Sequence, residues 1–306
     1  MKQYLDSLRH IVRTGHLKGD RTGTGTKSVF GYQERYDLKE SFPIITHRKV
    51  SVRSIFGELV WFLSGSTNIE DLKNLGSTVW DEWADRTGSI GPMYGSTWRG
   101  KAPYKIDQIA EVLKLLNDDP NSRRIIIDSW YPEQLPLAKT KPSDNPPLGR
   151  MALAPCHMMC QFYVDENAML SCQLYLRSSD TLLGKPYNIA CYAALVHILC
   201  ALTGYRPGEL VVTTGDMHIY NNHIVDGALT KILAAETFDL PTMDITDAFE
   251  EGAIVIDKLD SDADVSVYSD ILNKYFVENP KDTLDKLVNG LSKYQSGPAI
   301  KMKVSV

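Results

Sequence analysis

Apolar residues recur every three or four positions in several parts of the chain, the spacing that places them on one face of a helix. This pattern predicts a first helix over residues 4–12, which the glycine-rich stretch 19–25 follows. A second helix is expected over 54–64 and a third over 106–116. The second helix is unusual, because the carboxylate of Glu58 lies inside its apolar stripe.

The middle of the chain changes to strand-like patterning. Residues 124–130 are rich in β-branched side chains, 160–164 are apolar and 169–176 alternate, so we expect neighbouring strands in one sheet. The proline-rich stretch 135–149 is expected to be an exposed loop, because proline lacks the N–H that a central strand needs. The apolar run 189–202 is expected to be a buried helix, because it is shorter than the roughly 20 residues of a membrane span.

The C-terminal part of the chain is patterned less clearly. Residues 239–279 are acidic, with one strand expected at 253–256. A helix is expected over 282–291. Residues 300–306 alternate apolar side chains with lysine or serine, which predicts an extended amphipathic tail.

Composition narrows the classes of protein. The 306 residues, 43% apolar and 23% charged, supply a core for one large globular domain or two small ones. The net charge of −5 comes from interspersed charges, which argues against a basic nucleic-acid-binding face. Five cysteines without a Cys-x-x-Cys pair indicate neither a disulfide framework nor a zinc site. We therefore expect a cytoplasmic protein that needs no membrane and no nucleic acid.

The densest chemistry begins at Cys156, which lies between Pro155 and His157. A lone cysteine is more often packing than a nucleophile, because an unperturbed thiol, with a pKa of about 8.5, is mostly protonated at neutral pH. Arg177 and Ser178 follow the alternating strand, and a guanidinium with a hydroxyl suits a phosphate dianion and favours a thiolate. A salt bridge at the strand end would explain Arg177 equally well, so these residues alone leave both interpretations open.

Nine segments, in order along the chain, resemble signature segments of the thymidylate synthase family. The resemblance covers about residues 1–235 and resumes at 297–306, whereas 239–296 match poorly. The nine segments are 20–26, 58–63, 79–84, 91–95, 122–126, 151–157, 177–180, 188–190 and 215–220.

The resemblance implies an α+β fold in which a large mixed sheet is flanked by helices, and two such sheets pack back to back in a symmetric homodimer. It implies a single catalytic domain over 1–306, with a divergent segment at 239–296 and a tail at 297–306 that closes over the folate. It also implies an activity: a methyltransferase that converts dUMP to dTMP, using 5,10-methylenetetrahydrofolate as the donor of carbon and hydride, without a metal.

The resemblance assigns catalytic roles that suit the residue types. Cys156 would add to C6 of the uracil and make C5 nucleophilic. Glu58 would move protons at O4 and at the folate nitrogen, as a carboxyl with a raised pKa can. Tyr94 and His157 would order the water that removes the C5 proton. Trp80 would exclude water from the transferred carbon, so that hydride meets it instead.

Binding roles follow from the same resemblance. The phosphate would be held by Arg21, Arg177 and Ser178, joined by Arg123 and Arg124 from the other subunit, and these arginines would keep Cys156 ionised.

The remaining binding residues would contact the base, the sugar and the folate. Asn188 would read the uracil edge, since its amide offers both a donor and an acceptor, although asparagine is also a common helix cap. His218 and Tyr220 would bind the 3′-hydroxyl, and Asp180, counted among the catalytic residues, would anchor the pterin. The full set expected to contact the folate is Arg48, Trp80, Asp180, Leu183, Gly184 and Val306.

Four positions depart from the family pattern. Glutamine, asparagine, lysine and a His-Pro pair are usual where this chain has Leu176, Tyr131, Arg48 and Gly297 with Pro298. Lost polar groups change the water beside a pocket, so a dUMP hydroxymethylase of the same fold is the alternative. A nucleotide-binding protein without catalysis would need neither Cys156 nor Glu58, and the motifs of a zinc deaminase are absent.

Overall fold

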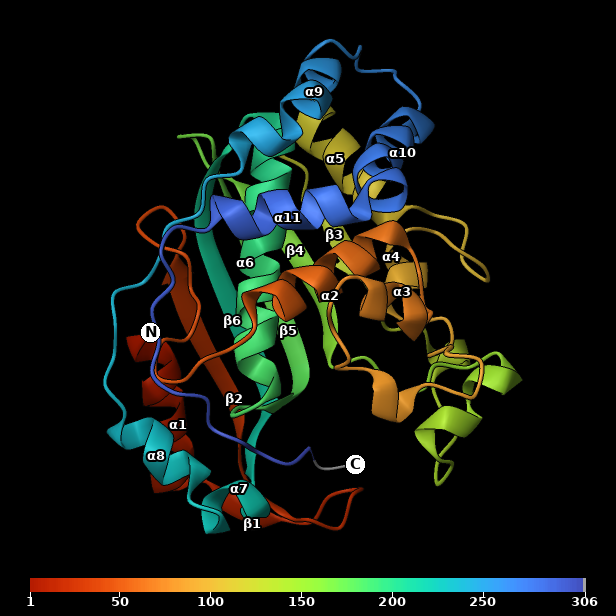
Figure 1. Ribbon diagram of the computed structural model, residues 1–306. Coiled ribbons are helices and arrows are strands. Elements are labelled where there is room, and N and C mark those ends of the chain that lie inside the picture. Colours follow the sequence, from red (N-terminus) through yellow and green to blue (C-terminus); the bar gives the residue numbers. More distant parts are fainter. Residues whose placement is uncertain (305–306) are drawn as a thin grey trace.

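Six strands form one mixed sheet in the computed structural model, which describes residues 1–304 (Figure 1). The strands are β1 (His16–Lys18), β2 (Thr26–Asp37), β3 (Ile126–Asp128), β4 (His157–Val164), β5 (Met169–Asp180) and β6 (Arg206–Tyr220). Their order across the sheet is β1-β2-β6-β5-β4-β3. Neighbours are antiparallel except β5 and β6, which run parallel. The predicted α+β class with a mixed sheet is confirmed.

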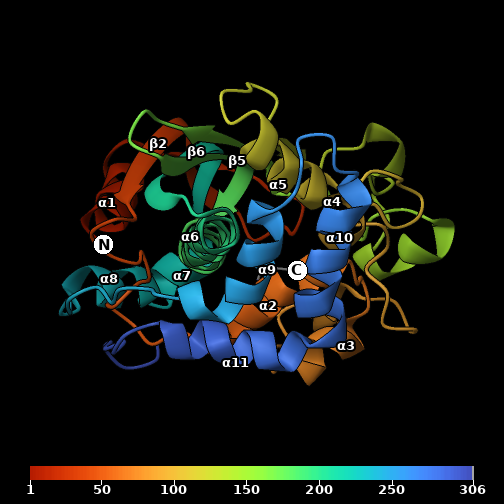
Figure 2. The same ribbon diagram turned by 90° about the horizontal axis from the view of Figure 1, so that it is seen from above.

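Helices pack against one side of this sheet, as the view from above shows (Figure 2). They are α1 (Lys2–Thr14), α2 (Val52–Ser64), α3 (Ile69–Asn74), α4 (Tyr94–Trp98), α5 (Gln108–Asp118), α6 (Gly184–Thr203), α7 (Asn221–Val225), α8 (Ala228–Ala234), α9 (Thr246–Asp257), α10 (Val265–Asn273) and α11 (Pro280–Gly290). Shorter helical turns lie at Asp81–Trp83, Pro132–Gln134, Pro142–Asp144, Pro146–Leu148 and Lys274–Glu278.

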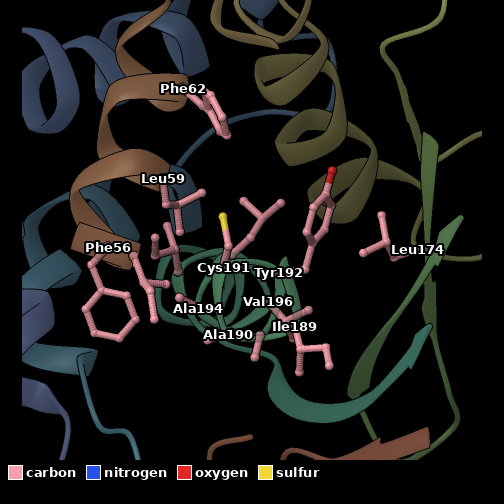
Figure 3. Close-up of a cluster of buried hydrophobic side chains, with 14 of the residues drawn as sticks. Phe56, Leu59, Phe62, Leu174, Ile189, Ala190, Cys191, Tyr192, Ala194 and Val196 are labelled. Carbon is pink, nitrogen blue, oxygen red and sulfur yellow. The ribbon is translucent and has the colours of Figure 1, made fainter. Parts of the chain in front are cut away.

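Helix α6 is the centre of the core. It packs between strands β5 and β6 on one side and helices α2 and α9 on the other. Figure 3 shows Phe56 and Leu59 of α2 on one side of α6, and Tyr192 on the side where Leu174 of β5 lies. The helix has the length and apolar composition of a membrane span, yet 78% of its most apolar stretch is buried inside the fold. The prediction of a buried helix is confirmed, although it begins at Gly184 rather than at Ile189.

One predicted strand and one predicted helix start are wrong. The strand expected at 253–256 lies inside α9, because Phe249, Gly252 and Ile256 recur at helical spacing and are buried. Ile106 precedes α5 and is 63% exposed, since the side chain of Asp107 accepts the Ala110 N–H and begins the helix there.

The predicted loop and tail are both present. Residues 135–149 form an excursion with two short helical turns, and the helix expected over 282–291 is α11. The tail is tied to the body where the Gly297 N–H donates to the Thr46 carbonyl (2.8 Å) and His223 Nε2 lies 2.8 Å from the Lys303 carbonyl. Val306 lies outside the described residues.

Candidate active site

A cavity of about 810 Å³, a size suited to a small ligand, opens at the ends of β5 and β6. Six of the predicted site residues line it: Cys156, Arg21, Arg177, Ser178, His218 and Tyr220. A larger cavity of about 990 Å³ lies between α2, α3 and the start of α11, and its lining residues include neither cysteine nor histidine. Cys156, Arg21 and Arg177 therefore meet in the smaller cavity.

The Arg177 guanidinium holds the loop that carries Cys156. Its Nε donates to the Pro155 carbonyl and its Nη2 to the Ala154 carbonyl, each at 2.8 Å. The guanidinium also lies 5.5 Å from the centre of the Trp130 ring. This fork fixes the cation beside the cysteine, whereas Arg21 is exposed on its glycine-rich loop.

Two aromatic side chains fix the backbone at Cys156. The Cys156 N–H donates to Tyr94 Oη at 2.9 Å. The Tyr94 ring stacks on His157 with 3.7 Å between centroids, and His157 Nδ1 lies 3.0 Å from Tyr192 Oη. Burial lowers the pKa of His157 to about 3, so its ring is neutral. Tyr192 was missed by the sequence analysis, because inside an apolar helix it resembles any core aromatic.

Two opposing effects act on the pKa of the Cys156 thiol. Burial raises its pKa, and the positive charge of Arg177 lowers it by less. Arg123 and Arg124 are exposed and do not line the cavity of their own chain. The structure describes a single chain, so the expectation that Arg123 and Arg124 from the other subunit help to keep the thiol ionised stays a prediction.

Glu58 is a buried carboxyl poised near neutrality. Its side chain, 8% exposed on α2, accepts the Trp80 Nε1–H at 2.6 Å. Burial raises its pKa to about 7 against the lowering effect of that hydrogen bond. The centre of the Trp80 ring in turn lies 5.9 Å from that of Tyr94. Trp80 and Tyr94 therefore connect Glu58 with the backbone of Cys156.

The segment between β5 and α6 carries the predicted folate contacts. Asp180 Oδ1 accepts the N–H groups of Leu182 (3.0 Å) and Leu183 (3.2 Å), and Gly184 begins α6. Arg48 is 5% exposed; its Nη2 donates to the Leu182 carbonyl at 2.8 Å, and its buried Nε has no partner. None of Arg48, Asp180, Leu183 and Gly184 is among the residues that line the cavity.

The sugar-binding candidates are held by Asp216. His218 Nδ1 lies 3.1 Å from Asp216 Oδ1 and Lys18 Nζ lies 2.5 Å from Oδ2, contacts that lower the pKa of Asp216 to about 2. The Tyr220 ring is 5.1 Å from that of His218. Asn188 is partly exposed within α6. The capping interpretation of Asn188 is wrong, because the helix begins at Gly184.

Two of the four departures from the family pattern pack against neighbouring side chains. Leu176 is fully buried and pairs with His157 across β4 and β5. The Tyr131 ring lies 4.4 Å from Tyr104. Leu176 thus lies inside the fold, whereas Tyr131 is partly exposed.

The cavity also has walls that the sequence analysis did not identify. Trp83, Leu153, Lys139 and Lys141 line it, and the two lysines come from the proline-rich loop. Within residues 1–304, no three His, Cys, Asp or Glu side chains are grouped so as to hold a metal ion.

Comparison with known proteins agrees with the motifs. A family model described as thymidylate synthase matches residues 2–271, and so includes residues 239–271 of the segment that matched the family motifs poorly. Curated thymidylate synthases of Francisella philomiragia and of Francisella tularensis subsp. holarctica are each 47% identical to this chain over 245 residues, 80% of this chain and 88% of the relative. The chain belongs to the thymidylate synthase family.

Proposed function

We propose that the chain is a thymidylate synthase, a methyltransferase that converts dUMP to dTMP while 5,10-methylenetetrahydrofolate becomes dihydrofolate. One observation carries the proposal: a single cavity holds the nucleophile Cys156 together with Arg21, Arg177 and Ser178, the groups that suit a phosphate. The hydroxymethylase alternative is not favoured, since the curated relatives are named thymidylate synthase.

The residues divide the chemistry among them. With the phosphate bound at Arg21 and Arg177, Cys156 Sγ passes its proton to solvent water and adds to C6 as the thiolate. The C5–C6 π electrons move to C5 and O4, where Glu58 supplies a proton. Glu58 can donate and accept a proton near neutral pH, because its pKa is about 7. Tyr94 and neutral His157 hold the water that takes the C5 proton.

The residues present also fit a reduced folate. The unpartnered buried Nε of Arg48 is a donor for an anionic oxygen, and Asp180, which uses only Oδ1 to cap its turn, can accept from a pterin. When bound, the folate supplies the one-carbon unit and the hydride. Leu183 and Gly184 are proposed to contact the folate beside Asp180, and Val306 is proposed to close over it.

A homodimer completes the proposal. Helices cover one side of the sheet (Figure 2), while Gln33, Arg35, Gln173 and Tyr163 are exposed on strands β2, β5 and β4. Two such faces packed back to back would carry Arg123 and Arg124 to the partner's cavity. We further propose one catalytic domain over 1–306, supported by the continuous core from Met1 to Leu291, and a cytoplasmic location, supported by five free cysteines.

Replacing the nucleophile tests this function. Cys156→Ser is expected to bind dUMP but to lose turnover by at least about a thousandfold, because a hydroxyl is a far weaker nucleophile than a thiolate. Cys200→Ser, a buried cysteine near the end of α6, is the matched control and should keep turnover. Steady-state kinetics and dUMP titration measure both. Unchanged turnover by Cys156→Ser would remove it as the nucleophile.

A further inference from the structure

The proline-rich loop 135–149 forms part of the wall of the nucleotide cavity, and hydrogen bonds within the loop hold its shape. Fully buried Asn145 organises it: Oδ1 accepts the Leu137 N–H at 2.9 Å and Nδ2 donates to the Lys141 carbonyl at 3.0 Å. Arg150 closes the base of the loop through the Leu135 carbonyl (2.9 Å). A compact surface loop packed by its own side chains, whose ends lie close together, is an Ω-loop, a type that is frequently functional.

The tip of this loop presents two lysines to the site. Lys139 and Lys141 line the same cavity as Cys156 and Arg177. Lys139 has a φ of 64°, a left-handed conformation that only one other non-glycine residue shares within residues 1–304, Ala168 in the β4–β5 turn. Such conformations persist where the surrounding structure holds them, and they cluster at ligand-binding sites.

The charges of these lysines are free to act on a ligand. In the part of the chain that the structure describes, the ion pairs include neither Lys139 nor Lys141, whereas Lys18 at the same cavity is paired with Asp216. Both are exposed, so water screens them in the bound state and their main effect falls on the approach of an anion.

We propose that Lys139 and Lys141 form an electrostatic rim that captures the phosphate of dUMP and passes it to Arg21 and Arg177. The inference rests on the proposed function and adds to it two residues that capture the substrate. The phosphate is favoured over a folate carboxylate, because Arg21, Arg177 and Ser178 share the lining with the lysines and Arg48 does not.

Association kinetics test the rim. Stopped-flow tryptophan fluorescence, with Trp83 in the cavity wall, follows dUMP binding to the wild type and to Lys139→Asn/Lys141→Gln. Asparagine tolerates the left-handed conformation, so the double variant removes charge and keeps the loop shape. We expect association to slow by about three- to tenfold at low ionic strength and to approach the wild-type rate at high salt, with dissociation changed by less than about twofold.

Three comparisons make the test specific. Lys258→Asn/Lys281→Gln, exposed lysines away from this cavity, should associate like the wild type, and Lys141→Gln alone should be intermediate. Deoxyuridine, which lacks the phosphate, should bind both proteins at the same rate. The rim is overturned if dUMP associates with the double variant at the wild-type rate, if deoxyuridine slows equally, or if only folate binding weakens. Methylation of dUMP by the wild type in the same preparation tests the proposed function separately.

Discussion

The carboxyl of Glu58 accepts one hydrogen bond, from the Trp80 indole, in a core that otherwise offers it apolar surroundings. Its charged form is therefore poorly compensated, and its pKa rises from 4.5 to about 7. A carboxyl with this pKa is present in both protonation states at neutral pH, which is what the two proposed proton transfers require.

The same burial makes stability depend on pH. Below pH 4.5 the group is protonated in both native and unfolded states, and between 4.5 and about 7 only the native state holds the proton. The contribution of Glu58 protonation to the free energy of unfolding is thus present at low pH and is lost as the pH rises through 7. From pH 4.5 to 8 the wild type should lose about 3 kcal/mol more free energy of unfolding than Glu58→Gln, which does not titrate. Urea unfolding across this range measures it; parallel curves would contradict the assigned pKa.

The first turn of α6 is joined to β2 by a buried ion pair. Lys185 is fully buried and pairs with Glu34, which is 4% exposed. Burial lowers the pKa of Lys185 and the charge of Glu34 raises it, while Met217 Sδ lies 3.1 Å from the ammonium. Each charge therefore depends on the other for compensation.

Removing one partner should be worse than removing both. Lys185→Met or Glu34→Met alone should lower the free energy of unfolding by about 3–5 kcal/mol, because an unpaired charge stays buried. The double variant should lie within about 1 kcal/mol of the wild type or above it, since well-packed apolar residues often replace a buried pair without loss. Thermal and urea unfolding of the three variants decide; a double variant as unstable as the singles would show that the pair itself stabilises the fold.

Several helices and strands were predictable from the sequence, and others were not. Apolar periodicity located α1, α2 and α5, and a continuous apolar run located α6. A helix was also expected where α11 lies, and alternation located β5. Strands β2 and β6 were missed because Glu34 and Thr214 face the core and interrupt the apolar pattern. The strand expected in α9 rested on Ile254 and Val255, which lie 47% and 44% exposed on that helix.

The residues of the candidate site were predictable only where they belong to recognisable sequence motifs. Cys156, Arg177 and their neighbours stand in recognisable segments. Tyr192 and Lys139 belong to no such segment, and only the fold brings one to His157 and the other to the cavity.

At the scale of the whole molecule, helices cover one side of the sheet and leave the other side uncovered (Figure 2). It carries exposed polar residues and Tyr163, 65% exposed, and a hollow of about 670 Å³ lies on it. Because Arg123 and Arg124 do not line their own cavity, the proposed dimer gives both the face and the arginines a role.

Subunit complementation tests that dimer. Arg124→Ala and Cys156→Ser should each have little activity alone. After mixing and subunit exchange, each heterodimer should contain one site with an intact cysteine and an intact arginine, so activity should return to about a quarter of the wild-type value if exchange is random. Sedimentation of the wild type reports the dimer itself. If activity does not recover after full exchange, Arg124 acts in the active site of its own subunit.

The reaction is tested most directly by the identity of its product. The protein is incubated with dUMP and 5,10-methylenetetrahydrofolate, the nucleotide is weighed by mass spectrometry, and dihydrofolate is followed by absorbance. We predict that the nucleotide gains the mass of one CH2 group and that one dihydrofolate forms for each dTMP. A nucleotide that gains the mass of CH2O, without dihydrofolate, would contradict the account.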